Sequence, residues 1–523
     1  MSTLYRGGHV YSPADPRATA ILVDGERVAW LGPDDDAPAA DRIVDLAGAL
    51  VTPAFVDAHV HATSTGLMLT GLDLGAVRSA AELLDAVAEH ASGLPERAVL
   101  LGFGWDESTW DDRALPMKEQ IDRAAGGRAA LLCQASMHSA LCSSALLAAA
   151  GAELTAQPGY DPSGLVRRDA HHRVRTIALG ALTPAQRGAA QQTALRHAAR
   201  LGIAAIHECA GPVISSEDDL TALLAASGVE NGLPDVYGYW GELMAAAKVK
   251  DLGAVGAAGD LFADGALGAR TAHLREPYVD GEQAGARGHG YVSADQVSEH
   301  IVDCVRHGVQ GGFHAIGDEA ISTVIAGYRA AAVVVGLERL RAGRHRIEHV
   351  EIVDRTIIGS LVELGLVASM QPAFDRLWGG DRQMYVRRLG LSRSLESNPM
   401  GAMHGVGVAL AFGSDSPVTP LDPWGSVRAA VWHHNPTHRM SARSAFAAHT
   451  RGGWRAVHRD TEGVLAPGAS ATFAVWSQPP RATPAGSPDA AGSGARLPSL
   501  DPDESLPVCR LTVLRGTTLY EAS

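Results

Sequence analysis

The chain has 523 residues, of which 46% are hydrophobic and 20% are charged, so a sizeable core is possible and global disorder is excluded. The net charge of −14 argues against non-specific nucleic-acid binding, which requires a basic face. Five scattered cysteines without a CxxC pair are typical of a reduced protein rather than a disulfide framework. The N-terminus has no apolar signal-peptide core, and the apolar stretches are too short to span a bilayer. We therefore expect a cytoplasmic protein that binds neither membrane nor nucleic acid.

Both ends of the chain contain short strand-like runs separated by turns. In residues 1–52, Asp24-Gly25 is a strong hairpin signal between two such runs. Similar runs return in residues 452–523, where they flank a Pro-, Ala-, Ser- and Gly-rich stretch, 478–504, that we expect to be a flexible surface loop. Strand-rich segments at both ends predict that residues 1–52 and 452–523 together form one composite β-sandwich domain.

The central part of the chain, residues 53–451, alternates short apolar runs with helical segments. Runs such as 98–103 and 129–133 have strand length, and 293–307 has helical length and periodicity. This alternation predicts a parallel sheet with crossover helices, and at this size a (β/α)8 TIM-like barrel with insertions. We expect an insertion within 75–200, because no candidate metal ligand interrupts that stretch.

Histidines and one aspartate end several of the apolar runs in the predicted barrel. His59 and His61 alternate on one strand, so their side chains point to the same side and form a chelate for a divalent metal. His314, His349 and Asp415 each follow a later strand-like run. Barrel active sites form at the C-terminal ends of the strands, where side chains from different strands meet. The pattern therefore predicts a metal centre, because chance histidines would not share this position in the predicted barrel.

The motifs resemble those of the metal-dependent amidohydrolase superfamily, in its YtcJ-like branch (the amidohydrolase 3 group), which includes N-substituted formamide deformylase. The resemblance spans nearly the whole chain. The matching segments are TPAFVDAHVHATSTG (52–66), GFGWDES (102–108), FADGALGARTAHLREPY (262–278), FHAIGDEAI (313–321), RIEHVEI (346–352), GSDSPV (413–418) and TEGVLAPGASATF (461–473).

The resemblance assigns roles to individual residues. It implies that His59, His61, His314, His349 and Asp415 bind metal, and that Asp415 also takes the proton from the attacking water. No Walker A, GxSxG, SxxK or HExxH pattern is present in the sequence, so phosphate-loop, serine-hydrolase and zincin chemistry lack support.

One position departs from the family pattern. Many relatives carry a lysine there, whose carboxylated form bridges two metals, whereas this chain has Asp260. Asp260 could bridge two ions as a shorter carboxylate, or the site could hold one ion with Asp260 outside its ligands. Because an aspartate is much shorter than a carboxylated lysine, we expect one tightly held ion and any second ion to be weak.

Three further residues are candidates for substrate binding. Arg270 could bind a carboxylate or carbonyl group, although a salt bridge would explain it equally well. His138 matches a family histidine near the substrate pocket, with a buried hydrogen-bonded histidine as the alternative. Trp105 could form a pocket wall or belong to the core.

These features predict a hydrolase of carbon–nitrogen bonds other than peptide bonds, acting on an amide, formamide or cyclic amide of a small molecule. The expected cofactor is a divalent metal, as one or two ions, with Zn²⁺ favoured over Fe, Mn or Ni, which accept the same ligands. A deaminase on the same barrel and a non-catalytic binding protein are the alternatives. A homodimer is compatible with the sequence, and the substrate's identity is not predicted.

Overall fold

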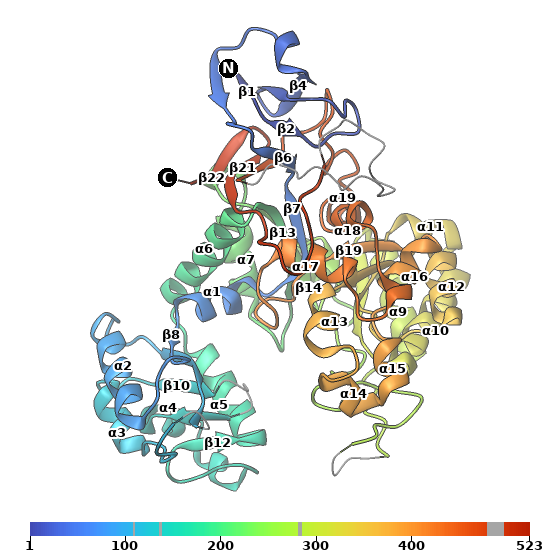
Figure 1. Cartoon of the computed structure of the whole chain (residues 1–523). Coiled ribbons are helices and arrows are strands. Elements are labelled where there is room, and N and C mark those ends of the chain that lie inside the picture. The colour runs from blue at the N-terminus through green and yellow to red at the C-terminus, as the bar shows by residue number, and fades with distance from the viewer. Residues whose placement is uncertain (108–109, 135–138, 281–284, 478–495, 523) are drawn as a thin grey trace. The chain divides into compact units, whose positions relative to one another are not determined.

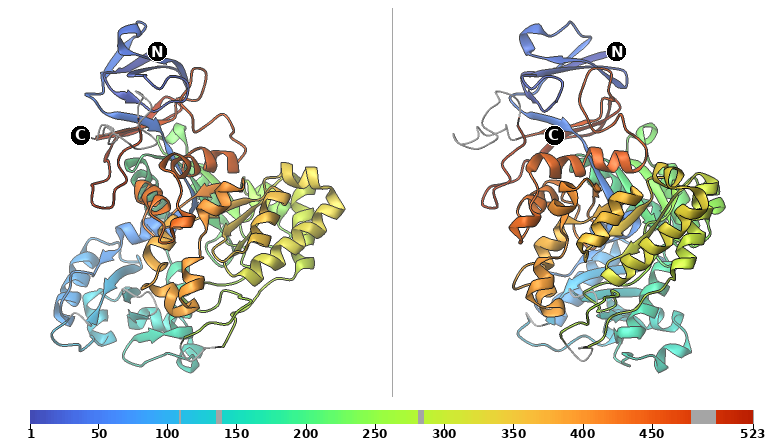
Figure 2. Two further views of the ribbon diagram at one scale, coloured as in Figure 1. Left: turned by 45° about the vertical axis from the view of Figure 1, so that its right-hand side comes forward. Right: turned by 90° about the vertical axis from the view of Figure 1, so that its right-hand side faces the viewer.

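The structure is a computed structural model that describes residues 1–107, 110–134, 139–280, 285–477 and 496–522, except for the side chains of 168 and 172. The chain forms two compact units. One contains Met1–His61 and Leu195–Ser523, and the other contains Ala62–Ala194. Each unit is described by itself below, and Figures 1 and 2 show the chain coloured from its N-terminus to its C-terminus.

The larger unit contains an eight-stranded parallel sheet in the order β19-β18-β17-β16-β15-β14-β13-β7. Its strands are β7 (Phe55–Val60), β13 (Ile203–Ala210), β14 (Asp235–Trp240), β15 (Gly256–Ala257), β16 (Gln310–Ala315), β17 (Arg346–His349), β18 (Val367–Met370) and β19 (Ala409–Phe412). The two edge strands meet just beyond their C-terminal ends, where the Asp415 N–H donates to His59 O at 2.8 Å and the His61 N–H donates to Ser416 O at 2.9 Å. The sheet is therefore a nearly closed barrel of the TIM type, as predicted.

Helices connect the barrel strands. They are α7 (Glu217–Ala226), α8 (Ala246–Asp251), α9 (Ala294–His307), α10 (Asp318–Val335), α11 (Leu337–Ala342), α12 (Arg355–Leu364), α13 (Pro372–Trp378), α14 (Met384–Leu389), α15 (Leu391–Leu395), α16 (Met400–Gly405), α17 (Pro423–Val431), α18 (Ala442–Ala448) and α19 (Arg451–Ala456). Helix α9 illustrates the local signals: Ser293 and Gln296 form a capping box, and Gly308 ends the helix at φ +66°. Its buried face carries Val297, Ile301 and Cys304 at spacings of three and four residues.

A small β-sandwich uses both ends of the chain. One sheet has the order β4-β3-β1-β5 and the other β2-β6-β20-β21-β22, so the N-terminal strands lie beside the C-terminal ones (Figures 1 and 2). The strands are β1 (Ser2–Arg6), β2 (His9–Val10), β3 (Ala20–Asp24), β4 (Arg27–Gly32), β5 (Arg42–Asp45), β6 (Leu50–Pro53), β20 (Phe473–Trp476), β21 (Cys509–Leu514) and β22 (Thr517–Glu521). The two sheets share one apolar core, which includes Tyr5, Ile21, Val51, Phe473 and Val513.

The second unit, Ala62–Ala194, has its own sheet in the order β12-β11-β10-β9-β8. Its elements are α1 (Ala62–Thr70), β8 (Leu72–Asp73), α2 (Ala80–Ser92), β9 (Leu100–Trp105), α3 (Lys118–Ala124), β10 (Ala130–Gln134), β11 (Ser139–Cys142), α4 (Ser144–Ala149), β12 (Leu165–Arg167) and α5 (Arg168–Gly180). Helix α6 (Pro184–Arg200) crosses from this unit into the barrel unit. In neither unit does a described helix have both the length and the apolar character needed to cross a membrane.

Candidate metal centre

Strand β7 brings two imidazoles to the C-terminal end of the barrel. His59 is fully buried and His61 is 8% exposed, and the Nε2 atoms of the two rings lie 3.5 and 3.2 Å from the same oxygen, Oδ1 of Asp415. Asp415 is held there by its backbone bond to β7 and has a left-handed backbone conformation, with φ +57°. Asp57 reinforces this junction, because its carboxylate accepts the Ser414 N–H at 2.8 Å. His59, His61 and Asp415 thus form a compact group of potential ligands.

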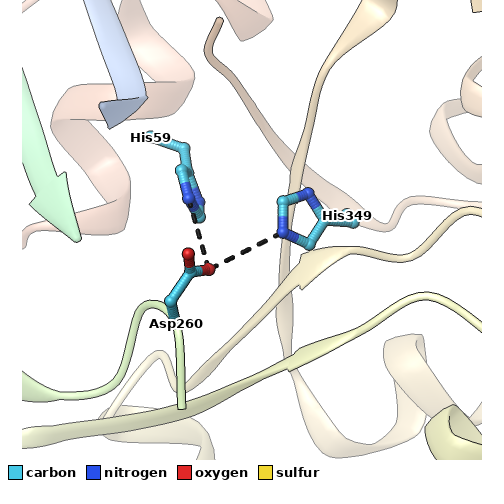
Figure 3. A group of neighbouring side chains, drawn as sticks. All are labelled: His59, Asp260 and His349. Atoms are coloured by element: carbon cyan, nitrogen blue, oxygen red, sulfur yellow. Dashed lines mark ion pairs between the residues drawn. The ribbon is translucent and has the colours of Figure 1, made fainter. Parts of the chain in front are cut away.

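Asp260 lies among all four histidines predicted to bind metal. Its Oδ2 is 3.3 Å from His61 Nε2, and its Oδ1 is 3.5 Å from His59 Nε2, 3.5 Å from His314 Nδ1 and 3.8 Å from His349 Nε2. Figure 3 shows Asp260 facing His59 and His349. The preceding residue must be glycine, because Gly259 has φ +78° and an added Cβ would meet Cys209 at 3.1 Å.

The separations in this group suit ligands of a metal better than hydrogen bonds. Two ligand atoms at about 2.0–2.1 Å from a tetrahedral ion lie about 3.4 Å apart, whereas good N–H···O bonds cluster near 2.9 Å. The nitrogen–oxygen distances here run from 3.2 to 3.8 Å. Within the described residues, four of these buried atoms have no hydrogen-bond partner: His59 Nε2, His314 Nδ1, Asp260 Oδ1 and Asp415 Oδ1.

The electrostatics of the group also favour a cation. Burial acts to raise the pKa of Asp260, but the surrounding histidines outweigh it and hold the pKa well below its usual value. Burial acts to lower the pKa of His349, but Asp260 and Asp415 outweigh it and raise the pKa to about 9. The same two carboxylates raise the pKa of His61 against the effect of burial. The carboxylates therefore attract positive charge, which a divalent ion can supply in place of protons.

Hydrogen bonds on the far side of three rings fix which nitrogen faces the centre. His59 Nδ1–H donates to Glu348 Oε2 at 2.9 Å, because an ionised carboxylate only accepts. His314 Nε2–H donates to the Gly265 carbonyl at 3.2 Å, and His349 Nδ1 lies 2.8 Å from Gln371 Oε1. In each ring the other nitrogen faces the centre and can offer its lone pair to a metal there once it carries no proton, which is how outer partners orient metal-binding histidines.

Two of the three candidate substrate residues have hydrogen-bond partners within their own unit. Arg270 makes a two-pronged ion pair with Asp280 at 2.9 and 2.8 Å, so its guanidinium already has a partner. Trp105 is 1% exposed in the core of the Ala62–Ala194 unit, where its indole N–H donates to Leu132 O at 2.7 Å. His138 falls outside the described residues. Substrate binding by these three residues remains a prediction.

The sequence analysis overlooked the residues that support the histidines, above all Glu348, Arg346 and Gln371. Glu348 directly precedes His349, and strict strand alternation would point the two side chains to opposite faces. In the structure His349 has φ +71°, and the strand ends there. Glu348 contacts the outer nitrogen of His59, whereas His349 faces Asp260 in the centre. A charged pair at positions i and i+2 of a fully buried strand, Arg346 and Glu348, was the available signal.

Comparisons with known proteins identify the family of the chain. The sequence model of the Amidohydrolase family (Amidohydro_3) matches residues 42–520. The chain is 25% identical to "Putative amidohydrolase YtcJ" of Bacillus subtilis (strain 168) over 100% of both chains. It is 27% identical to "Protein LONG AFTER FAR-RED 3" of Arabidopsis thaliana over 83% of this chain and 79% of that protein.

A solved structure is similar over most of the fold. An uncharacterized metal-dependent hydrolase from Pyrococcus furiosus matches with a TM-score of 0.76 and 26% identity, covering 91% of this chain and 98% of that one. The family model covers well over half of the chain. The chain therefore belongs to the amidohydrolase family, in its YtcJ-like branch, and it is a hydrolase.

Proposed function

We propose that this protein hydrolyses a non-peptide carbon–nitrogen bond in a small molecule, such as an amide, formamide or cyclic amide, with a divalent metal as cofactor. The observation that carries the proposal is the position of two carboxylates among buried imidazoles, at distances of 3.2–3.8 Å: Asp260 contacts four of these rings and Asp415 contacts two. The reduced state of all five cysteines, which are buried and free, supports a cytoplasmic location.

We propose that the ligand atoms form two overlapping sets. His59, His61 and Asp415 form one set, which closes the junction of β7 and β19. His314 and His349, from β16 and β17, approach Oδ1 of Asp260, the oxygen that His59 also approaches. Asp260 contacts both sets through its two oxygens, so it is a ligand in this proposal and can serve either one ion or two. Nitrogen and carboxylate donors in this number suit Zn²⁺ and also accept Fe, Mn or Ni.

When bound, a divalent metal lowers the pKa of water to roughly 7 and polarises a carbonyl group. The chain's own contribution is to hold and move protons. Asp415 takes the proton of the attacking water and delivers it to the leaving nitrogen, as a general base and then a general acid. Glu348, Gln371 and the Gly265 carbonyl keep the histidine rings in the tautomers that face the centre.

The test combines elemental analysis with a substrate screen. The purified protein should contain a transition metal, lose activity on chelation and regain it when the ion is returned. A panel of N-formyl, N-acyl and cyclic amide compounds should contain substrates that release an amine or a ring-opened acid. Turnover that releases only ammonia from aminated heterocycles would instead favour the deaminase. A protein that binds no metal and turns over none of these compounds would rule out the proposal.

A further inference from the structure

A buried ion pair lies behind the metal centre, inside the barrel. Arg346 and Glu348 are both 0% exposed, and they share a face of β17. The guanidinium binds the carboxylate through Nε to Oε1 at 2.5 Å and through Nη2 to Oε2 at 2.9 Å. The carbon at the centre of the guanidinium also lies 4.4 Å from the middle of the Tyr239 ring. Such a pair is costly to bury, and its retention in a barrel interior calls for an explanation.

The pair acts on one ligand strand in two ways. Glu348 Oε2 accepts the hydrogen bond of the His59 ring, and Arg346 Nη2 donates to the backbone oxygen of Ala58, the residue before His59, at 2.6 Å. Arg346 also donates to Ser369 Oγ on β18 at 2.9 Å. The ring and the backbone of His59 are thus fixed by the same two side chains.

His59 differs in this respect from the other candidate ligands. Within the described part of the chain, it is the histidine of this centre whose outer nitrogen is bonded to a carboxylate. His349 has the neutral amide of Gln371 there, and His314 has the carbonyl of Gly265. A carboxylate partner makes an imidazole a stronger electron donor than a neutral acceptor does, and it also fixes the ring's orientation.

We propose that Glu348, held by Arg346, is a positioning residue that makes the His59–His61–Asp415 set the tight metal subsite, the one that fills first. This inference rests on the proposed metal dependence. It explains why the charged pair is placed behind His59 rather than behind His349. It also predicts an asymmetry between the two sides of Asp260 that the histidines alone would not produce.

The test is a stepwise titration of the metal-stripped protein with Co²⁺, followed by the visible absorption of the bound ion and by calorimetry. Glu348→Gln should weaken the first binding step about 10–100-fold, as loss of an outer partner typically does. The matched control is Gln371→Ala, which removes the partner of His349 and should leave the first step within about threefold, well below that scale. Glu348→Asp, which keeps a carboxylate, should restore part of the lost affinity. An unchanged first step in Glu348→Gln, or an equal loss in Gln371→Ala, would overturn the proposal.

A second variant guards against misfolding, because Glu348→Gln leaves Arg346 as a buried unpaired charge. The double variant Arg346→Met/Glu348→Gln removes both charges and should fold while showing the same weakened first step. Wild-type affinity in the folded double variant would overturn the proposal. A wild-type protein that takes up no Co²⁺ would instead contradict the metal dependence itself, so the two failures are distinguishable.

Discussion

The two carboxylates of the centre have different surroundings and therefore different expected roles. Asp260 contacts four imidazoles, whereas Asp415, just after β19, contacts the two rings of His59 and His61. A carboxylate surrounded by four imidazoles is suited to a structural role as a shared ligand. The one at the edge of the group is better suited to exchanging a proton with a reacting molecule.

Replacing Asp415 by asparagine should separate metal binding from proton transfer. The amide still offers an oxygen ligand but cannot accept the proton of water, so metal content should remain largely unchanged while kcat falls about 10²–10⁴-fold. Elemental analysis and turnover of a substrate found in the screen would measure the two effects. A loss of kcat smaller than about tenfold, below the usual range for a general base, would assign the proton to another group.

Asp260→Ala should lower the metal content as strongly as His59→Ala does. The sequence left open whether Asp260 is a ligand, because an aspartate is short compared with a carboxylated lysine. In the structure the turn at Gly259 follows the two-residue strand β15, and it carries the shorter carboxylate into contact with all four histidines. Metal per chain would be measured after gel filtration, with His404→Ala, at an exposed histidine, as the control. Full metal content in Asp260→Ala would place this residue outside the ligands.

At the scale of secondary structure, Trp476 of strand β20 packs the sandwich against the barrel. The Trp476 indole N–H donates to Thr52 Oγ1 at 2.8 Å, and its ring contacts Phe55 and Trp424, with centroids 5.7 and 5.4 Å away. Gly202 fits closely against the indole, since an added Cβ there would lie 2.4 Å from it. The two folded parts of this unit therefore share a packed aromatic contact.

Trp476→Ala should lower the free energy of unfolding by about 3–5 kcal/mol, because it leaves a cavity at this contact. Urea unfolding followed by circular dichroism would measure the change. Tyr291→Ala, at a side chain that is 51% exposed, should change stability far less. Similar losses in both variants would mean that the contact at Trp476 contributes little to stability.

The sequence predicted the individual strands and helices better than it predicted which of them pair with one another. The alternation of His59 and His61 and the apolar runs before His314 and Asp415 followed from local patterns, and the barrel followed from alternating strands and helices. The runs at 98–103 and 129–133 look the same locally, yet they fall in the separate sheet of Ala62–Ala194. Local patterns do not record which sheet a strand joins, because pairing depends on residues far away in the chain. The support of His59 by Glu348, 289 residues later, was hidden for the same reason.

For the molecule as a whole, buried neutral histidines predict sensitivity to acid. Burial lowers the pKa of both His345 and His449 to about 4. His345 Nδ1 accepts the Gly311 N–H at 2.8 Å, and His449 Nδ1–H donates to the Val56 carbonyl at 2.9 Å. At these two sites the unfolded chain, with pKa values near 6.5, binds more protons than the folded chain between those values. His345 and His449 therefore lower the stability of the fold as pH drops through this window. Each group contributes at most about 3 kcal/mol to that loss.

This acid sensitivity can be measured by urea unfolding of the metal-free protein at pH 7 and pH 5. Metal must be removed because its binding also depends on pH. The loss of stability between the two pH values should be smaller in His449→Gln than in the wild type, since the variant has one fewer group to protonate. Parallel losses in the two proteins would show that His449 does not titrate in this range.

The interruption of the barrel after β7 also governs the order in which the protein can be completed during synthesis. Strand β13, the neighbour of β7 in the sheet, is synthesised only after the whole of Ala62–Ala194. Strand β6 pairs with β20, which is synthesised near the other end of the chain. The intervening unit has its own sheet and core, so it can fold while the first barrel strand is still unpaired. His59 and His61 emerge from the ribosome long before Asp415. If an ion needs Asp415 as well as His59 and His61, as proposed above, it can be held by the complete set only after almost the whole chain has been made.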